Sequence, residues 1–254
     1  MKGYAAFLRK EFVEQGRTHK LLIMLVVFTI FGMTSPLLAK LMPQILSSIG
    51  TDGITINFPE PTYMDAYAQL FKNVSQMGIV VLLLVFASSM SQELSRGTLV
   101  NVLAKGLPRT AVVTSKYTAC LALWTLSLAL TASVSYGYTL YLFGSHPTAH
   151  LLFSLLCLWL FGAFLLSVII LTGTLLKGGY GGLLATALVL GILLLLGIIP
   201  SSTHWNPVTL ASVSTSLLDG SVKTADIISA FWVSAGATVL CIAGAVLVFR
   251  KKQL

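Results

Sequence analysis

The amino-acid sequence predicts an all-α, polytopic membrane protein, with six transmembrane helices and an amino-terminal amphipathic helix at the membrane interface. Of its 254 residues, 56% are hydrophobic and 9% are charged, whereas a soluble globular chain carries roughly 25% charged residues. The mean hydropathy is +0.89. The apolar residues gather in six runs, and the basic residues gather mainly in alternate loops, which is typical of a membrane protein with a fixed orientation. Residues 1–254 are expected to form a single transmembrane domain.

Residues 1–20 predict a helix that lies flat on the inner membrane surface. Its apolar residues recur at helical spacing, and its basic residues lie mostly on the other side (Tyr4, Phe7, Leu8 and Phe12 against Arg9, Lys10 and Arg17). The basic side would face anionic headgroups. Glu11 falls among the apolar positions, so it either reaches a nearby cation or contacts another protein. An ordinary interfacial anchor is an equally good interpretation of this segment.

The six predicted spans cover residues 21–39, 70–90, 113–143, 149–176, 183–199 and 227–249. The third and fourth are longer than the ~20 residues that cross a bilayer, so we expect them to tilt or to extend into the cytoplasm. The first two spans are separated by a polar external loop, residues 40–69, with one short helix predicted near residues 36–46 and another leading into the second span. Residues 201–226 predict one or two short helices that dip into the outer leaflet.

The basic residues predict that both termini lie in the cytoplasm. With this orientation, of the 16 Lys and Arg residues only Lys40, Lys72 and Lys223 remain on the external side. Lys and Arg in short loops gather on the cytoplasmic side of multi-pass proteins. The net charge of +8 is therefore attributed to membrane topology, and no nucleic-acid partner is predicted.

A basic cytoplasmic loop, residues 92–112, joins the second span to the third. Leu99, Val102 and Leu103 share one side of a short helix, which Gly106 and Pro108 end. An amphipathic helix between two spans needs an apolar surface to press against, either the headgroup boundary or a groove on another protein. The favoured interpretation is a partner protein.

The spans contain few groups that could perform chemistry. No Asp, Glu, Lys, Arg or His occurs in residues 74–90, 117–143, 151–176 or 183–199, which argues against an intramembrane hydrolase and against ion-coupled transport. No catalytic residues and no metal site are predicted. The sequence also has no G-x-x-x-x-G-K-[ST] phosphate loop. If transport is driven by ATP, hydrolysis must take place on another chain.

Two stretches carry a family resemblance. The stretch FLRKEFVEQGRTHKLLIM is a basic amphipathic helix with an acid, Glu11, and an arginine, Arg17, before the first span. The cytoplasmic loop has an acid, a Gly-Thr-Leu step, a hydrophobic turn, a Pro with a basic residue, and a Lys that opens the third span (Glu93, Gly97, Thr98, Leu99, Leu103, Pro108, Arg109 and Lys116). With Pro207 and Gly220 in the last external loop, the sequence resembles the ABC transporter permeases of the type-2 exporter family.

The resemblance implies a permease subunit of an ATP-driven exporter, with ATP and Mg²⁺ held by separate cytoplasmic ATPase subunits. A second permease subunit, the same chain or a related one, would complete the transporter in the cell membrane. The substrate would be amphipathic or hydrophobic, such as a peptide antibiotic, a lipid or a drug. The basic loop would be a coupling helix, and its implied contacts with the ATPase are Glu93, Arg96, Gly97, Thr98, Leu99, Val102, Leu103, Lys105 and Arg109.

Two other interpretations account for the same residues. The chain could be a non-transporting membrane anchor or sensor that recruits a cytoplasmic partner through the basic loop. The loop could also be a simple interfacial helix that is basic only because it faces the cytoplasm.

Overall fold

The computed structural model describes residues 2–49, 60–95, 97–104, 106–144, 150–176, 180–222 and 224–252, and these residues contain helices and no strands. The first half of the chain forms α1 (Lys2–Arg17), α2 (Lys20–Ile49), α3 (Tyr63–Asn73), the π-helix η1 (Val74–Gly78), α4 (Ile79–Phe86), α5 (Ser91–Ser95), α6 (Thr98–Ala104) and α7 (Arg109–Phe143). The second half forms α8 (Leu151–Leu175), α9 (Gly181–Leu196), the 3₁₀-helix η2 (Pro200–Ser202), α10 (Thr209–Ser212), α11 (Ser214–Leu218) and α12 (Thr224–Lys251).

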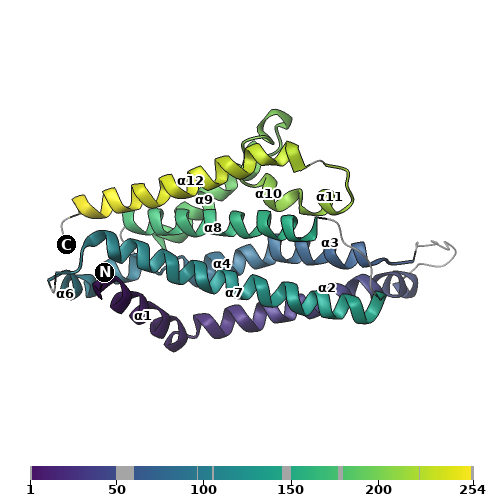
Figure 1. Cartoon of the computed structure of the whole chain (residues 1–254), viewed down its shortest axis with the longest axis horizontal. Helices are drawn as coiled ribbons and strands as arrows, with labels where there is room; N and C mark the ends of the chain where they lie inside the picture. The colour runs from purple at the N-terminus through teal and green to yellow at the C-terminus, as the bar shows by residue number, and fades with distance from the viewer. Residues whose placement is uncertain are drawn as a thin grey trace.

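The long helices lie side by side along one axis and form an elongated bundle (Figure 1). Both marked chain ends lie at the end of the bundle that carries α6, while α11 and the start of α3 lie at the opposite end (Figure 1). This arrangement agrees with the prediction that both termini and the basic loop are on one side of the membrane. Which side that is remains a prediction.

Within the described residues, five helical segments are long and apolar enough to cross a membrane, so the chain is a multi-pass membrane protein. They cover Lys20–Ile45, Tyr63–Ser95, Arg109–Phe143, Leu151–Leu175 and Thr224–Lys251. The span expected at residues 183–199 is α9, an apolar helix of 16 residues. At 1.5 Å per residue it reaches about 24 Å, less than the ~30 Å thickness of a hydrocarbon core. A sixth crossing therefore remains a prediction.

The boundaries of the first two spans differ from the predicted ones. The short helix expected near residues 36–46 is not separate from the first span, because α2 continues without a break through Pro36 and Pro43 to Ile49. Pro is tolerated inside membrane helices because neighbouring groups and small local adjustments satisfy the freed backbone carbonyls. The second span starts earlier than residue 70, because Thr62 and Asp65 form a capping box that begins α3.

Helix α8 is the central helix of the bundle. In its most apolar stretch 78% of the residues are buried, against 17% for α12, so α12 lies at the outside of the bundle. A smaller hydrophobic cluster lies at the end of the bundle that carries α6. We call it the end cluster, and its buried members are Phe7, Met90, Leu99, Val112, Val113, Ile170, Ala245 and Phe249.

The contact between α7 and α8 depends on one glycine. Trp124 of α7 is fully buried, and its indole N–H donates to the Trp159 carbonyl of α8 at 3.0 Å. A Cβ at Gly162 would lie 2.3 Å from the nearest atom of this indole. The absence of a side chain at residue 162 therefore lets the tryptophan lie directly against the α8 backbone.

We expect Gly162→Ala to destabilise the protein, because Trp124 would have to leave its position. Overpacking of this kind costs about 1–3 kcal/mol. Gly137→Ala is the matched control, since a Cβ there meets no atom within 4 Å and Ala favours a helix over Gly by about 1 kcal/mol. Thermal unfolding of the detergent-purified variants tests this, and equal melting temperatures for the two variants would contradict it.

Candidate functional site

Five charged side chains meet where α1, α5 and α7 converge. Lys10, Glu11 and Glu14 come from α1, Glu93 from α5 and Lys116 from α7. We call this group the ion cluster. It includes Glu93 of the basic loop, and it joins segments that are about 80 to 105 residues apart in the sequence.

Lys116 is at the buried centre of the ion cluster. Its side chain is 2% exposed, and its Nζ lies 2.9 Å from Glu11 Oε2 and 3.0 Å from Glu93 Oε2. A charge taken out of water is costly unless it is paired and hydrogen-bonded. The burial of Lys116 therefore requires that both carboxylates stay in place.

Lys10 closes the cluster from the half-exposed side. Its Nζ lies 2.6 Å from Glu93 Oε1 and 3.2 Å from Glu11 Oε1, and it also pairs with Glu14 one helical turn away. Partial burial alone would lower the pKa of Lys10, but its hydrogen bonds to Glu14 and Glu93 raise that pKa above the ordinary value of 10.5. Lys10 therefore stays charged throughout the physiological range.

The helical spacing of α1 explains how its residues reach the cluster. Phe7, Glu11 and Gln15 are four residues apart, so they share one side of the helix, and all three are buried. Phe7 packs in the end cluster, and the Tyr4 hydroxyl lies 3.0 Å from the Thr118 hydroxyl of α7. The side of α1 that was expected to lie on the membrane is thus packed partly on α7. Of the two roles left open for Glu11, the nearby cation is confirmed.

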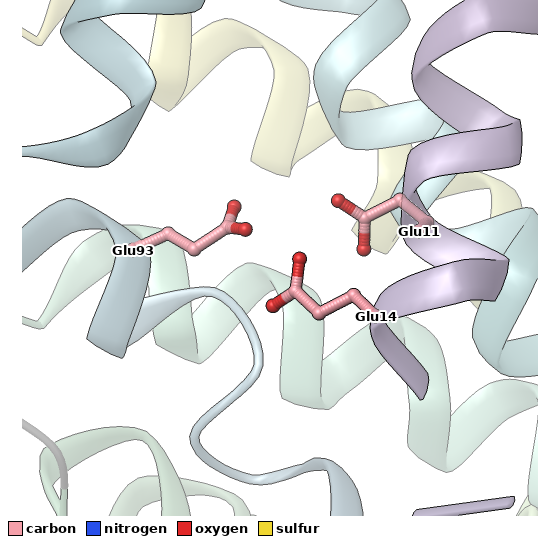
Figure 2. A group of neighbouring side chains, drawn as sticks. All are labelled: Glu11, Glu14 and Glu93. Atoms are coloured by element: carbon pink, nitrogen blue, oxygen red, sulfur yellow. The ribbon is translucent and has the colours of Figure 1, made fainter. Parts of the chain in front are cut away.

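The three carboxylates of the cluster point toward one another (Figure 2). One oxygen of each lies within 4.8 Å of the others, so the group has the donor type that Ca²⁺ or Mg²⁺ prefers. The ammonium groups of Lys10 and Lys116 already contact these carboxylates. The lysines supply the positive charge that a metal ion would otherwise bring, so the cluster is better suited to holding helices together.

The apolar side of the loop helix α6 is turned inward. Leu99 is 1% exposed and belongs to the end cluster, and Leu103 packs against the same cluster. Arg96 and Lys105 lie outside the described residues, as does the side chain of Val102. A partner protein that docks on the loop in this conformation would therefore meet the other side of α6, where Thr98 is exposed.

The other predicted site residues have separate positions. Gly97 and Gly106, before and after α6, have positive φ angles of 66° and 85°, which few residues besides Gly adopt. Arg109 donates hydrogen bonds to the backbone carbonyls of Phe249 and Arg250, so it ties the start of α7 to the end of α12. Arg17 is exposed at the end of α1 and lies outside the ion cluster.

The pairing of these charges was not predicted from the sequence. Glu93 was predicted to contact an ATPase subunit, but it is 8% exposed and its ion-pair partners in the structure lie within the chain. Lys116 was singled out only as the lysine that opens the third span in the motif resembling the type-2 exporter permeases. The signal that could have linked them was Glu11, an acid at an apolar position of α1, which needs a cation close by.

The comparisons with known proteins agree with a membrane protein. No protein-family model matches the chain. The uncharacterized transmembrane protein YxlG of Bacillus subtilis (strain 168) is 24% identical over 145 residues, which are 56% of this chain and 56% of that protein. The chain therefore matches about half the length of this curated relative. The similarity supports a polytopic membrane protein, and it shows neither an ABC family nor a transport role.

We expect Lys116→Met to be strongly destabilising, because it leaves Glu11 and Glu93 buried without their shared cation. Breaking a buried pair from one side costs about 3–5 kcal/mol. Adding Glu11→Gln should restore part of the loss, since it removes one of the uncompensated charges. The control is Lys40→Met, at an exposed lysine of α2. Unfolding of the four purified proteins tests this, and a loss for Lys116→Met no larger than for Lys40→Met would contradict it.

The raised pKa of Lys10 predicts how its ion pairs respond to pH. Their contribution to stability is fully present below pH 10.5, the ordinary pKa, and is lost as the pH rises through the raised value. Amine labelling followed by mass spectrometry at pH 10.5 should therefore modify Lys10 several-fold faster in a Glu14→Gln variant than in the natural chain. Labelling of the Lys72 peptide should be the same in both. Equal labelling rates at Lys10 in the natural chain and in Glu14→Gln would show that the Glu14 carboxylate does not raise the pKa of Lys10.

Proposed function

We propose that this chain is the membrane permease of an ATP-driven exporter, with both termini in the cytoplasm and with ATP and Mg²⁺ bound by separate ATPase subunits. The substrate class that suits its spans is amphipathic or hydrophobic. Two observations support this function: the family resemblance of the sequence and one feature of the structure. That feature is a mostly apolar pocket beside the membrane segment Tyr63–Ser95, with polar side chains along one wall.

This pocket has a volume of about 980 Å³ and lies between α2, α3 and α9. Its apolar walls include Leu38 and Met42 of α2 and Leu194 of α9, while the α3–η1 stretch contributes polar side chains, namely Gln69, Lys72, Ser75 and Gln76. Lys72 and Gln76 are exposed on this side of the bundle. Polar groups on a membrane segment avoid lipid and usually face a water-filled cavity or another protein.

A second permease subunit would explain the polar side of this segment. Two copies, or this chain and a related one, could place their polar segments opposite each other and enclose a pathway between them. The π-helix Val74–Gly78 lies in the middle of the segment, and π-helical turns inside α-helices occur often at functional sites. An anchor or sensor subunit would have no need of such a pathway, so the pocket favours the permease over that alternative.

The ion cluster supplies a mechanical connection to the ATPase. If an ATPase displaces α6, the motion passes along the chain to Glu93 in α5, and from Glu93 through the ion pairs to Lys10 and Lys116. Helices α1 and α7 would then move with the loop. Arg109 extends the connection to α12 through its backbone bonds.

Affinity purification of the tagged chain from its native membranes tests this proposal. In mild detergent we expect it to bring down an ATPase that has a phosphate loop, identified by mass spectrometry. Ala104→Arg, at an exposed position of α6, should reduce ATPase recovery about tenfold, since an unpaired charge would have to be desolvated in the interface. The matched control is Ser221→Arg, exposed beyond α11 near the opposite end of the bundle.

Two results would contradict parts of this proposal. Equal recovery of the ATPase with both variants would show that the loop is not its docking site. Recovery of a cytoplasmic partner without an ATP site, in place of an ATPase, would contradict the permease and favour the anchor or sensor subunit. Changes at Leu99 or Leu103 are unsuitable for this test, because these residues pack inside the chain and their loss would affect folding.

A further inference from the structure

A second pocket, of about 720 Å³, opens on the side of the bundle next to the ion cluster. It is distinct from the pocket on α3. One wall is polar and is formed by the end of α1, the start of α2 and the turn between α4 and α5. The other wall is apolar and is formed by α2 and α4, with Ile23, Val27, Val81, Leu84 and Val85.

The polar wall contains two groups that lack full partners within the described part of the chain. Lys20 donates a hydrogen bond to the Ser89 hydroxyl at 2.9 Å, but it makes no ion pair there. Gln15 is 5% exposed, and its Oε1 accepts no hydrogen bond from these residues. Ser88 adds another hydroxyl to the same wall. A buried polar group without a partner usually indicates a bound molecule or water.

The position of this pocket suggests a lipid. Lys20 is the first residue of the first candidate span, so it lies at the depth where headgroups meet the hydrocarbon core. The apolar wall continues from there along the span. Ile23 and Leu84 are 42% and 63% exposed, so the pocket opens sideways, toward the lipid that surrounds the bundle. A molecule entering from that side would place a polar head on Lys20 and a chain between α2 and α4.

The charges around the pocket indicate which headgroup would fit. The ion cluster has three carboxylates and two ammonium groups, and all five side chains line the pocket. The cluster alone therefore has one surplus negative charge, and Lys20 adds a separate positive charge. Glu14 is the most exposed of the three acids, at 38%. A headgroup with one phosphate and one ammonium group would match both charges at once.

We propose that this pocket binds a glycerophospholipid whose headgroup ends in a primary ammonium group. The phosphate contacts Lys20 and the hydroxyls of Ser88 and Ser89, the ammonium group approaches Glu14, and one acyl chain lies along Ile23 and Leu84. Such a lipid joins α1, α2 and α4 beside the ion cluster. The inference depends only on a membrane location, so it stands apart from the transport role.

Native mass spectrometry of the full chain in detergent tests this site. The probes are phosphatidylethanolamine, phosphatidylcholine and phosphatidylglycerol with identical acyl chains. We expect phosphatidylethanolamine to bind best, because the quaternary ammonium of phosphatidylcholine cannot donate hydrogen bonds and phosphatidylglycerol adds an unbalanced negative charge. Lys20→Gln should weaken phosphatidylethanolamine binding about tenfold, the effect of losing one charge-assisted hydrogen bond.

Three further variants make the test specific. Lys20→Arg should keep the binding, because it keeps the charge and the hydrogen-bond donors. Lys40→Gln, on the same helix near its other end, should leave binding unchanged. Glu14→Gln should remove the preference for phosphatidylethanolamine over phosphatidylglycerol.

Several outcomes would overturn the proposal. Equal binding by the natural chain and Lys20→Gln would show that the pocket is an unselective apolar groove. Preference of the natural chain for phosphatidylglycerol would contradict the role of Glu14. A dimeric chain that retains none of the three lipids would show that a second copy covers the pocket.

Discussion

The arrangement of the bundle end that carries α6 depends on the need to neutralise a lysine inside a bundle of apolar helices. Lys116 is 2% exposed, and only carboxylates in direct contact can hold a charge at that depth. One carboxylate comes from α1 and the other from α5, so both segments must pack against α7 for the lysine to be buried. The basic loop thereby becomes part of the bundle instead of an appendage on its surface.

The sequence was a good guide to the helices and a poor guide to their contacts. Hydropathy alone places the five long spans, because a bilayer permits few alternatives to a helix. The predicted first span ended at residue 39, before the basic Lys40, whereas α2 continues to Ile49 with Pro36 and Pro43 inside the helix. Hydropathy also cannot tell which surface an apolar side faces. The pattern around Leu99 is the same whether it packs on a partner or, as here, on the end cluster.

The candidate site illustrates the same limit. Glu11 and Glu93 were both selected from the sequence, but for different roles, and their common partner, Lys116, lies 105 residues from Glu11. Pairing at such distances depends on tertiary packing, which a single sequence does not reveal. The two pockets lie beside different parts of the segment Tyr63–Ser95. Residues between 65 and 80 line the larger pocket, and residues between 81 and 93 line the other. This segment therefore contributes Glu93 to the ion cluster near one end and lines the larger pocket toward the other.

Hydrogen–deuterium exchange of the full chain in lipid nanodiscs is the most direct test of whether the ion cluster holds α1 against the bundle. The amides of Phe7, Glu11 and Gln15 lie on the packed side of α1. If α1 is docked through the cluster, amides in this helix exchange on the same slow timescale as those around Lys116 in α7. Exchange within seconds, as in a helix that only rests on the membrane surface, would contradict the account.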